Sequence, residues 1–213
     1  MRLRAVLFDL DGTLIDSYRD IALHLNRTLR DFSMEEVDVE SVRHMVGGGA
    51  KNLLKRFFSD GTLEEAIGVF MEYYMQEPVI HTRTFEGIKE LLACLKEEGI
   101  CMAVVTNKME KLSREILNRL SLTNYFSFIV GGDTYAEKKP SSIPVLKTLD
   151  VLGIKSNEAI MLGDTEADIT AGKLAGTWTG LAKWGYIKSM GEKPHFEFDR
   201  PLDLCLLLRQ GTG

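Results

Sequence analysis

The sequence predicts an α/β fold in which a parallel sheet carries helices on both faces and an all-helical segment is inserted near the start. Short, unbroken apolar runs such as 5–8 alternate with helical segments of about a dozen residues, which is typical of buried parallel strands in βαβ units. The stretch from about 16 to 81 instead carries helical periodicity and no convincing strand. Polar residues, among them Asp9 and Asp11, follow several of the apolar runs where each strand would end.

The inserted segment is predicted to hold several helices in succession. Residues 18–32 place apolar side chains at helical spacing, and 33–36 have the form of a capping box that opens a second helix. Residues 53–58 mark a short apolar helix face. Asp60-Gly61 then reads as a turn, and the capping box at 62–65 opens a helix that runs to about Gln76.

The remainder alternates regularly between helices and apolar runs, and glycine ends three of the helices, as is common at helix C-termini. Strands are predicted at 100–105, 126–130, 159–162 and 177–181, and helices at 86–98, 109–120, 141–152, 165–175 and 202–208.

Composition narrows the class of protein. Apolar residues make up 45%, enough for a sizeable core, and the formal net charge of −5 comes without a basic stripe, which argues against a nucleic-acid surface. No apolar run is long enough to cross a membrane, and the apolar stretch after the basic start at 1–4 ends at Asp9, which is too short for a signal peptide. Cys94, Cys101 and Cys205 are odd in number and scattered, so we expect buried or free thiols in a reducing cytoplasm.

Parallel sheets bind ligands beyond the carboxyl ends of their strands, so the polar residues there are candidate site residues. Each has a simpler structural explanation: Asp-Gly can end a strand, Thr106 and Asp164 can cap helices, and Lys139 can be a solvated loop lysine. The coincidence of four strand ends with useful chemistry favours a shared function. The residues are Asp9 and Asp11 after the first strand, Thr106-Asn107-Lys108 after the second, Lys138-Lys139-Pro140 after the third, and Asp164 and Asp168 after the fourth.

The chemistry that these residues share is phosphoryl transfer. Mg²⁺ would let an anionic phosphate approach the carboxylates, with Asp9 and Asp164 as ligands and Asp168 steering a bound water or the lysine. Asp9 can attack phosphorus to form an aspartyl-phosphate, while Asp11 protonates the leaving oxygen and later accepts a proton from water. Thr106 and nearby backbone N–H groups can hold the phosphoryl oxygens, and Lys139 can offset the charge there. The candidate metal-site residues are Asp9, Asp11, Asp164 and Asp168.

Four segments together resemble the haloacid dehalogenase-like phosphohydrolase superfamily, namely 9–14, 104–108, 139–140 and 163–168. The resemblance implies a Rossmann-like core formed by 1–15 and 82–213, a helical cap formed by 16–81, and dependence on Mg²⁺. An aspartate nucleophile implies a phosphatase or phosphomutase rather than a dehalogenase.

Within the superfamily, Val46-Gly47-Gly48-Gly49 followed by Leu53-Leu54 is similar to the cap loop of phosphoglycolate phosphatase-like members. The chain departs from them at Phe85-Glu86-Gly87, where Tyr-Pro-Gly is usual, and at Lys138, where glycine usually precedes the motif lysine. Lys139 is the favoured phosphate-binding lysine because Pro140 fixes the register. The implied function is hydrolysis of a small phosphomonoester such as phosphoglycolate.

Two other functions are compatible with these residues. A phosphomutase of the β-phosphoglucomutase type would use the same aspartyl-phosphate, although Gly12-Thr13 favours the hydrolases, and a non-catalytic binding protein could retain the fold. The expected partner is a small phosphorylated metabolite, with no nucleic acid or membrane, and the chain is expected to be a monomer or homodimer. Candidate substrate-binding residues are Asn107, Gly48, Arg43, His44 and Lys51, although for each of the three charged residues taken alone a solvated helix surface is the favoured explanation. Closure of the cap is expected to hinge near Asp16-Ser17 and His81-Thr82.

Overall fold

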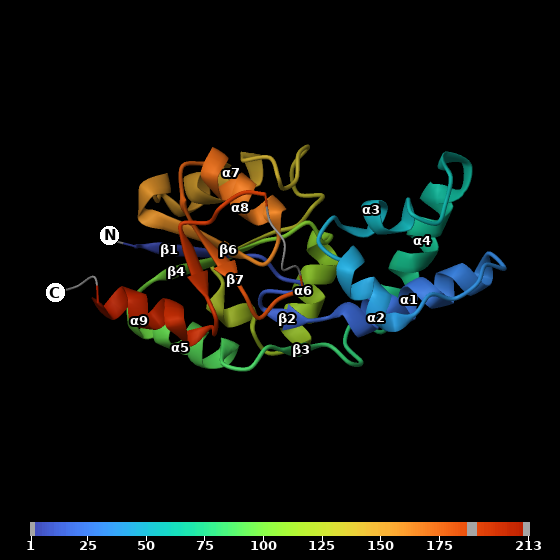
Figure 1. Cartoon of the computed structure of the whole chain (residues 1–213), viewed down its shortest axis with the longest axis horizontal. Coiled ribbons are helices and arrows are strands. Elements are labelled where there is room, and N and C mark those ends of the chain that lie inside the picture. Colours follow the sequence, from blue (N-terminus) through green and yellow to red (C-terminus); the bar gives the residue numbers. More distant parts are fainter. Residues whose placement is uncertain (1–2, 187–190, 211–213) are drawn as a thin grey trace.

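The computed structural model describes residues 3–186 and 191–210, so the termini and 187–190 of the predicted core lie outside the described residues. Figure 1 shows a sheet sandwiched between helices, and beside it a group of helices formed by an early part of the chain. The fold class predicted from the sequence is confirmed: a doubly wound, Rossmann-like α/β core accompanied by helices.

The central sheet has six parallel strands in the order β5-β4-β1-β6-β7-β8. From β1 the chain first forms β4 and β5 on one side of that strand and then β6, β7 and β8 on its other side. The carboxyl ends of β4, β1 and β6 therefore lie together, at the point where ligands bind in such sheets. The last strand, β8, was not predicted, since it has no apolar run. The strands are β1 (Ala5–Phe8), β4 (Cys101–Val105), β5 (Phe128–Val130), β6 (Ala159–Gly163), β7 (Trp178–Ala182) and β8 (Phe196–Phe198).

The unbroken apolar run of β1 arises because both faces of the strand are covered. Val6 and Phe8 point into one core, and Ala5 and Leu7 point into the other. The first core is packed by α5 (Ile88–Glu97), α6 (Glu110–Arg119) and α9 (Leu202–Gln210), and the second by α7 (Ile143–Leu152) and α8 (Glu166–Leu174).

The predicted helical segment contains α1 (Tyr18–Asp31), α2 (Val39–Val42), a 3₁₀ turn (Arg43–Met45), α3 (Ala50–Leu54) and α4 (Asp60–Gln76). The predicted capping box at Ser33 is wrong. Ser33 adopts a φ of 55°, and the N–H groups of Ser33 and Met34 donate to the carbonyls of Arg30 and Leu29. This is a Schellman-type ending of α1, and Asp38 caps the next helix instead.

The start of α4 also differs from the prediction. Asp60 and Gly61 belong to the first turn of the helix rather than to a turn before it, because Ser59 is the N-cap residue and its carbonyl accepts the N–H of Leu63. The box at 62–65 therefore lies inside the helix. The helix ends at Gln76, as expected.

A small second sheet joins the two ends of the helical segment. β2 (Ile15–Asp16) pairs antiparallel with β3 (Arg83–Thr84), with Ile15 opposite Thr84. The two points at which the chain passes between sheet and helices thus lie side by side.

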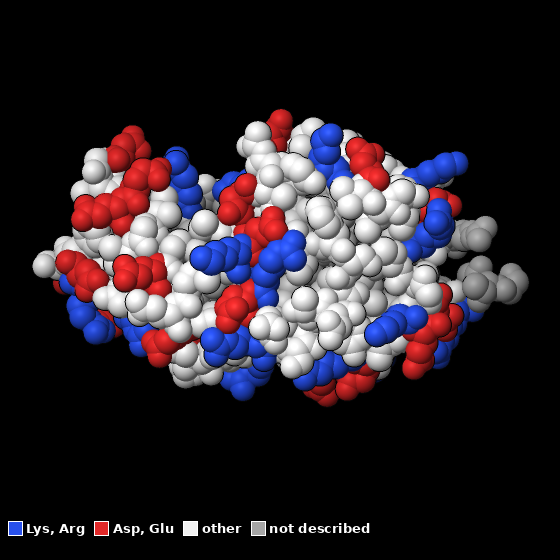
Figure 2. Space-filling model, turned by 180° about the vertical axis from the view of Figure 1, so that it is seen from behind, with Lys and Arg blue, Asp and Glu red and all other residues white. Residues whose placement is uncertain are grey.

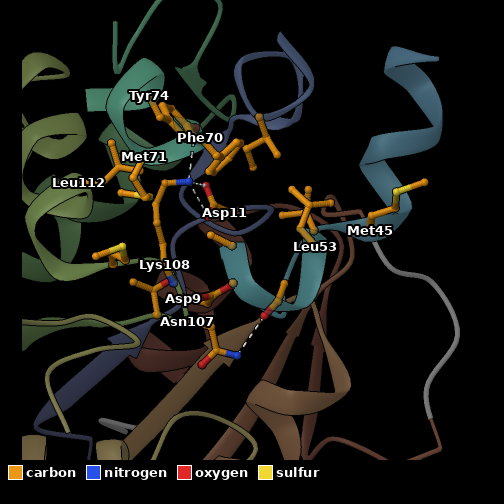
Figure 3. Close-up of a pocket in the computed structure, with 17 residues that line it drawn as sticks. Asp9, Asp11, Met45, Leu53, Phe70, Met71, Tyr74, Asn107, Lys108 and Leu112 are labelled. Carbon is orange, nitrogen blue, oxygen red and sulfur yellow. Dashed lines mark hydrogen bonds and ion pairs between the residues drawn. The ribbon is translucent and has the colours of Figure 1, made fainter. Parts of the chain in front are cut away.

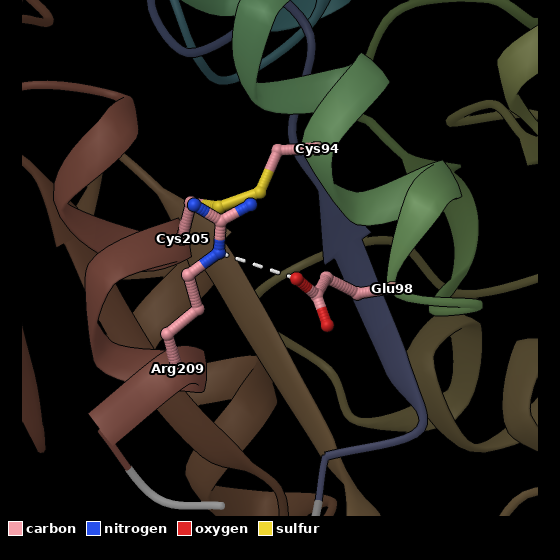
Figure 4. Close-up of a disulfide and its surroundings, with 4 residues drawn as sticks. All are labelled: Cys94, Glu98, Cys205 and Arg209. Carbon is pink, nitrogen blue, oxygen red and sulfur yellow. Dashed lines mark hydrogen bonds and ion pairs between the residues drawn. A yellow bond between two sulfur atoms is a disulfide. The ribbon is translucent and has the colours of Figure 1, made fainter.

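The prediction for the cysteines is wrong. Cys94 of α5 and Cys205 of α9 form a disulfide (Figure 4), with their Cα atoms 6.6 Å apart. Cys101 is a free thiol. The pairing could not be predicted from the sequence, because the two cysteines are 111 residues apart and meet only where α5 and α9 pack against each other. Because two of the three cysteines are paired, the cysteines no longer support a location in a reducing compartment.

Two observations concern the charge and the hydropathy of the described residues. On the face in Figure 2, acidic and basic side chains are interspersed rather than gathered into a basic stripe. No helix of the described part of the chain has the length and apolar character needed to cross a membrane.

Candidate active site

Four strand ends deliver polar side chains to one place. Asp9 follows β1, Thr106 follows β4 and Asp164 follows β6, while Lys139 comes from the loop after β5, and all four are buried. The ammonium of Lys139 donates to Asp9 Oδ1 at 2.8 Å, to Asp168 Oδ1 at 2.5 Å and to the carbonyl of Val105 at 2.5 Å. All three hydrogens of this ammonium therefore point to acceptors at the site.

The start of α8 positions Asp168. The backbone N–H and the hydroxyl of Thr165 donate to Asp168 Oδ2 at 3.0 and 2.6 Å, so the two residues form a capping box and leave the other carboxylate oxygen to Lys139. Thr165, and not Asp164, is therefore the N-cap residue, and Asp164 is free for another role. Its carboxylate accepts the Thr13 hydroxyl at 3.3 Å and the backbone N–H of Tyr186 at 2.8 Å.

Two glycines enclose Asp164. Gly12 has a φ of +87°, and a Cβ built on it would lie 2.3 Å from Asp164 Oδ2. A Cβ on Gly185 would lie 2.2 Å from Asp164 Cβ. Sequence reasoning missed Gly185 and Tyr186, although reading the residues beyond the fifth predicted strand as closely as the others would have pointed to them.

Asp9, Asp164 and Asp168 can each offer an oxygen to a common cation, since these oxygens lie within 4.8 Å of one another. Burial raises the pKa of Asp9 to about 6, against the opposing effect of Lys139. Burial, and then the charges of Asp9 and Asp168, raise the pKa of Asp164 well above its usual range. The Lys139 ammonium pairs with Asp9 and Asp168 but not with Asp164, so the cluster of three carboxylates is short of positive charge, and its oxygen-only donors suit a hard cation.

Asp11 is placed apart from that group. Its carboxylate forms an ion pair with Lys108, whose ammonium lies 3.0 Å from both oxygens, and it accepts the Ser17 hydroxyl at 2.5 Å. Asp9 and Asp11 both line a pocket between the strand ends and the helical segment (Figure 3). Asp11 thus faces the pocket rather than the three-carboxylate cluster.

The candidate substrate-binding residues are divided by the structure. Asn107 lines the pocket and donates from Nδ2 to the carbonyls of Gly47 and Lys139, both at 3.0 Å. Gly48, Arg43, His44 and Lys51 are not among the pocket-lining residues.

Gly48, Arg43 and Lys51 make contacts outside the pocket. The carbonyl of Gly48 accepts the Lys138 ammonium at 2.7 Å, so Lys138 and Lys139 turn to different places. Lys51 pairs with exposed Glu64 at 2.8 Å, and the Arg43 guanidinium lies over the rings of Tyr18 and Tyr186.

The pocket contains residues that sequence reasoning did not single out as substrate-binding. Lys108 was visible after the second strand, directly beyond Thr106 and Asn107. Tyr74 lies on the buried stripe of α4 with Phe70, and its spacing reads as ordinary core packing.

The fold and this site have counterparts among known proteins. The sequence model of the family described as haloacid dehalogenase-like hydrolase matches residues 6–182. The chain belongs to this family.

The relatives narrow the class further. A protein named phosphoglycolate phosphatase from Aquifex aeolicus is 49% identical over 206 residues, which is 97% of each chain. Another so named, from Neisseria meningitidis, is 38% identical over 191 residues, covering 86% of this chain and 81% of the relative. The crystal structure of a predicted phosphoglycolate phosphatase from Haemophilus somnus superposes with a TM-score of 0.89 at 28% identity, covering 97% of this chain and 98% of that one. The chain is a hydrolase of the phosphatase type within its family.

Proposed function

We propose that this phosphatase hydrolyses a small phosphomonoester, with phosphoglycolate as the first candidate, through an aspartyl-phosphate on Asp9 and with Mg²⁺ as cofactor. The observation that carries the proposal is the position of the Asp9 carboxylate. It lies at the end of the central strand, 2.8 Å from the Lys139 ammonium, within a cluster of oxygens suited to a cation, and it lines the pocket. The names of the relatives supply the candidate substrate.

The side chains take the following roles in this proposal. Asp9, Asp164 and Asp168 would hold Mg²⁺, which supplies positive charge between the substrate phosphate and the carboxylates. Lys139 holds Asp9 Oδ1, and the Asp9 carboxylate attacks phosphorus as the bond to the leaving oxygen breaks. Thr106 holds the phosphoryl oxygens, and the positive charge of Lys139 offsets their negative charge.

Asp11 moves the protons. It gives one to the leaving oxygen and later takes one from the water that attacks the aspartyl-phosphate, which releases inorganic phosphate and restores Asp9. Its place in the pocket, held by Lys108 and Ser17, suits this role better than that of a metal ligand.

We further propose that residues 16–81 act as a cap over the core of residues 1–15 and 82–213. The pairing of β2 with β3 supports these boundaries. A cytoplasmic location, a small phosphorylated metabolite as the partner, and a monomeric or homodimeric state are the accompanying predictions.

The first test is Asp9→Asn. We expect phosphate release from phosphoglycolate and p-nitrophenyl phosphate, each measured with Mg²⁺, to fall by about 10³-fold or more because the amide is a poor nucleophile. Asp31→Asn, which alters an exposed carboxylate at the end of α1, is the matched control. Near wild-type activity of Asp9→Asn would remove the proposed nucleophile, and conversion of a hexose 1-phosphate into the 6-phosphate would indicate a mutase.

A further inference from the structure

The pocket is small and its walls are mostly apolar. Its volume is about 40 Å³, and since one water needs about 10–15 Å³, it has room for about three or four water-sized groups. Among the described lining residues that lie within 16–81, Tyr74 alone has a polar side chain. The others are Ile21, Met45, Val46, Gly47, Gly49, Ala50, Leu53, Phe70 and Met71.

Such walls disfavour a leaving group with many hydroxyls. Each hydroxyl brought into the pocket would lose its water and find few partners, which costs binding energy. A sugar is therefore a poor fit in both size and chemistry. A short leaving group is favoured. Apart from Asp9, Thr106 and Asn107 at the strand ends, the polar residues that line the pocket gather in one corner, which any polar atom of the leaving group would have to reach.

That corner is formed by Lys108, Tyr74 and Asp11. Lys108 is 7% exposed, and its ammonium lies 3.0 Å from both oxygens of Asp11, 3.3 Å from the Tyr74 hydroxyl and 4.7 Å from the centre of the Tyr74 ring. Figure 3 shows its side chain rising from the strand end towards α4, with Asp11 beside the ammonium and Tyr74 above it. Of the lining residues that the structure describes, Lys108 alone carries a positive charge.

Lys139 cannot serve the leaving group in the same way. Its three hydrogens are taken by Asp9, Asp168 and the carbonyl of Val105. The two buried lysines are thus divided between two tasks, with Lys139 at the phosphoryl end and Lys108 at the leaving-group end.

We infer that Lys108, with the Tyr74 hydroxyl, is the specificity-determining pair that binds a carboxylate on the leaving group of a short phosphomonoester. This inference rests on the proposed function and names its substrate class. On binding, the substrate carboxylate takes the place of the Tyr74 oxygen beside the ammonium, and the Tyr74 hydroxyl turns to donate to it. Lys108 keeps Asp11 as its second partner and lies between the two negative groups, so that they do not repel each other directly.

The test compares two esters that differ in one group. Phosphoglycolate carries the carboxylate and ethyl phosphate lacks it, so the ratio of their kcat/KM values measures recognition of that group. We expect Lys108→Met to lower this ratio at least about 100-fold and Tyr74→Phe to lower it several-fold, since charge-assisted hydrogen bonds are lost. Lys108→Arg keeps the charge and is expected to keep most of the preference. Lys111→Met, on the exposed side of α6, is the matched control and leaves the ratio unchanged.

Binding gives a readout that is independent of turnover. Titration calorimetry with 3-phosphonopropionate and with propylphosphonate, which lacks the carboxylate, is expected to show a preference in the wild type that Lys108→Met abolishes. Inorganic pyrophosphate, whose second anionic group is a phosphoryl group, is the third substrate. Its faster hydrolysis than that of phosphoglycolate would overturn the assignment of a carboxylate.

A purely structural role for Lys108, acting through Asp11, makes a different prediction. Both esters would then lose activity equally and the ratio would stay constant, which would refute the inference. If Lys108→Met does not fold, Tyr74→Phe provides the test. An unchanged preference of Tyr74→Phe for phosphoglycolate over ethyl phosphate would also refute the inference. A wild type that releases phosphate from neither ester would refute the proposed function itself. Equal activity on both esters would spare that function and refute only the role of Lys108.

Discussion

At the scale of single residues, Asp164 is fully buried and enclosed by two glycines. The backbones of Gly12 and Gly185 lie against its carboxylate and Cβ, and a Cβ on Gly185 would also come within 2.5 Å of the carbonyl of Gly12. Protein interiors are packed too closely to absorb an added methyl group without moving their neighbours. The position of the Asp164 carboxylate thus depends on the absence of two side chains.

Gly185→Ala is expected to displace Asp164 and to act on both activity and stability. We expect kcat/KM to fall by about 10²-fold, as for a misplaced group in a catalytic site, and the free energy of unfolding to fall by about 1–3 kcal/mol. The control is Gly68→Ala in the middle of α4, where a Cβ meets no atom within 4 Å and helix propensity predicts a gain of up to about 1 kcal/mol. Urea unfolding and steady-state kinetics measure the two effects, and equal behaviour of the two variants would contradict the argument.

At the scale of elements, Asp20 fixes the place where the chain returns from the helices to the sheet. It lies in the first turn of α1, and its buried carboxylate accepts the backbone N–H groups of Ile80, His81 and Thr82 at 2.8–3.0 Å and the Thr82 hydroxyl at 2.6 Å. One side chain thus satisfies three consecutive backbone donors beside the β2–β3 pair. The predicted hinge at His81-Thr82 is held to α1 by these bonds, so movement there would have to carry α1 with it.

Asp20→Asn is expected to destabilise the protein in a pH-dependent way. Burial alone would raise the pKa of Asp20, but the hydrogen bonds outweigh burial and hold it below its usual range. A lowered folded-state pKa stabilises the protein above the unfolded-state pKa of about 4, and this contribution is lost as pH falls through the folded-state pKa. At pH 7 we expect Asn to cost about 2–4 kcal/mol, because its NH₂ group replaces one acceptor facing several donors.

Urea unfolding of wild type and Asp20→Asn between pH 7 and pH 3 measures this effect. The difference between the two proteins should be constant from pH 7 to about 5 and should shrink below about pH 4. Asp31→Asn, which loses one exposed bond from Tyr73, should change stability by no more than about 1 kcal/mol. A difference for Asp20→Asn that stays constant down to pH 3 would show that the charge of the carboxylate is not what matters.

At the scale of the whole molecule, the sequence predicted what local patterns and sheet topology determine. The apolar run before Asp9 predicts a strand covered on both faces, and the rule that ligands meet strand ends brings Asp9, Asp164 and Lys139 together before any contact is known. Tyr74 was not predicted as a pocket residue, because the apolar pattern of a buried helix face is the same whether that face lines a core or a pocket. Ser33 was wrongly predicted to begin a helix, because the left-handed residue that ends a helix is usually glycine.

Pairings over long sequence distances were out of reach for a different reason. Which surfaces of α5 and α9 meet is decided by how both helices pack on the same face of the sheet, and no pattern within either helix records it. Cys94 and Cys205 illustrate this, as does Tyr186, whose hydroxyl accepts the backbone N–H of Ser17 at 2.6 Å across most of the chain. Residues of this kind connect the beginning of the core with its end.

The disulfide makes this connection covalent. The loop that it closes contains five of the six strands of the central sheet, from β4 to β8, and its two helices cover the face of the sheet away from α7 and α8 (Figures 1 and 4). A cross-link over so long a loop removes much of the freedom of the unfolded chain. For a loop of about 100 residues the chain-entropy contribution reaches about 4–5 kcal/mol.

Reduction is therefore expected to lower the free energy of unfolding by up to about 4–5 kcal/mol while leaving kcat/KM for p-nitrophenyl phosphate unchanged, because neither cysteine lines the catalytic pocket. Urea unfolding with and without dithiothreitol measures the loss. Cys94→Ala should have the reduced stability under both conditions, whereas Cys101→Ala should respond to the reductant as the wild type does. Titration of the denatured, unreduced wild type should find a single free thiol, that of Cys101. Three free thiols, or equal stability with and without reductant, would mean that the two ends of the core are held together by packing alone.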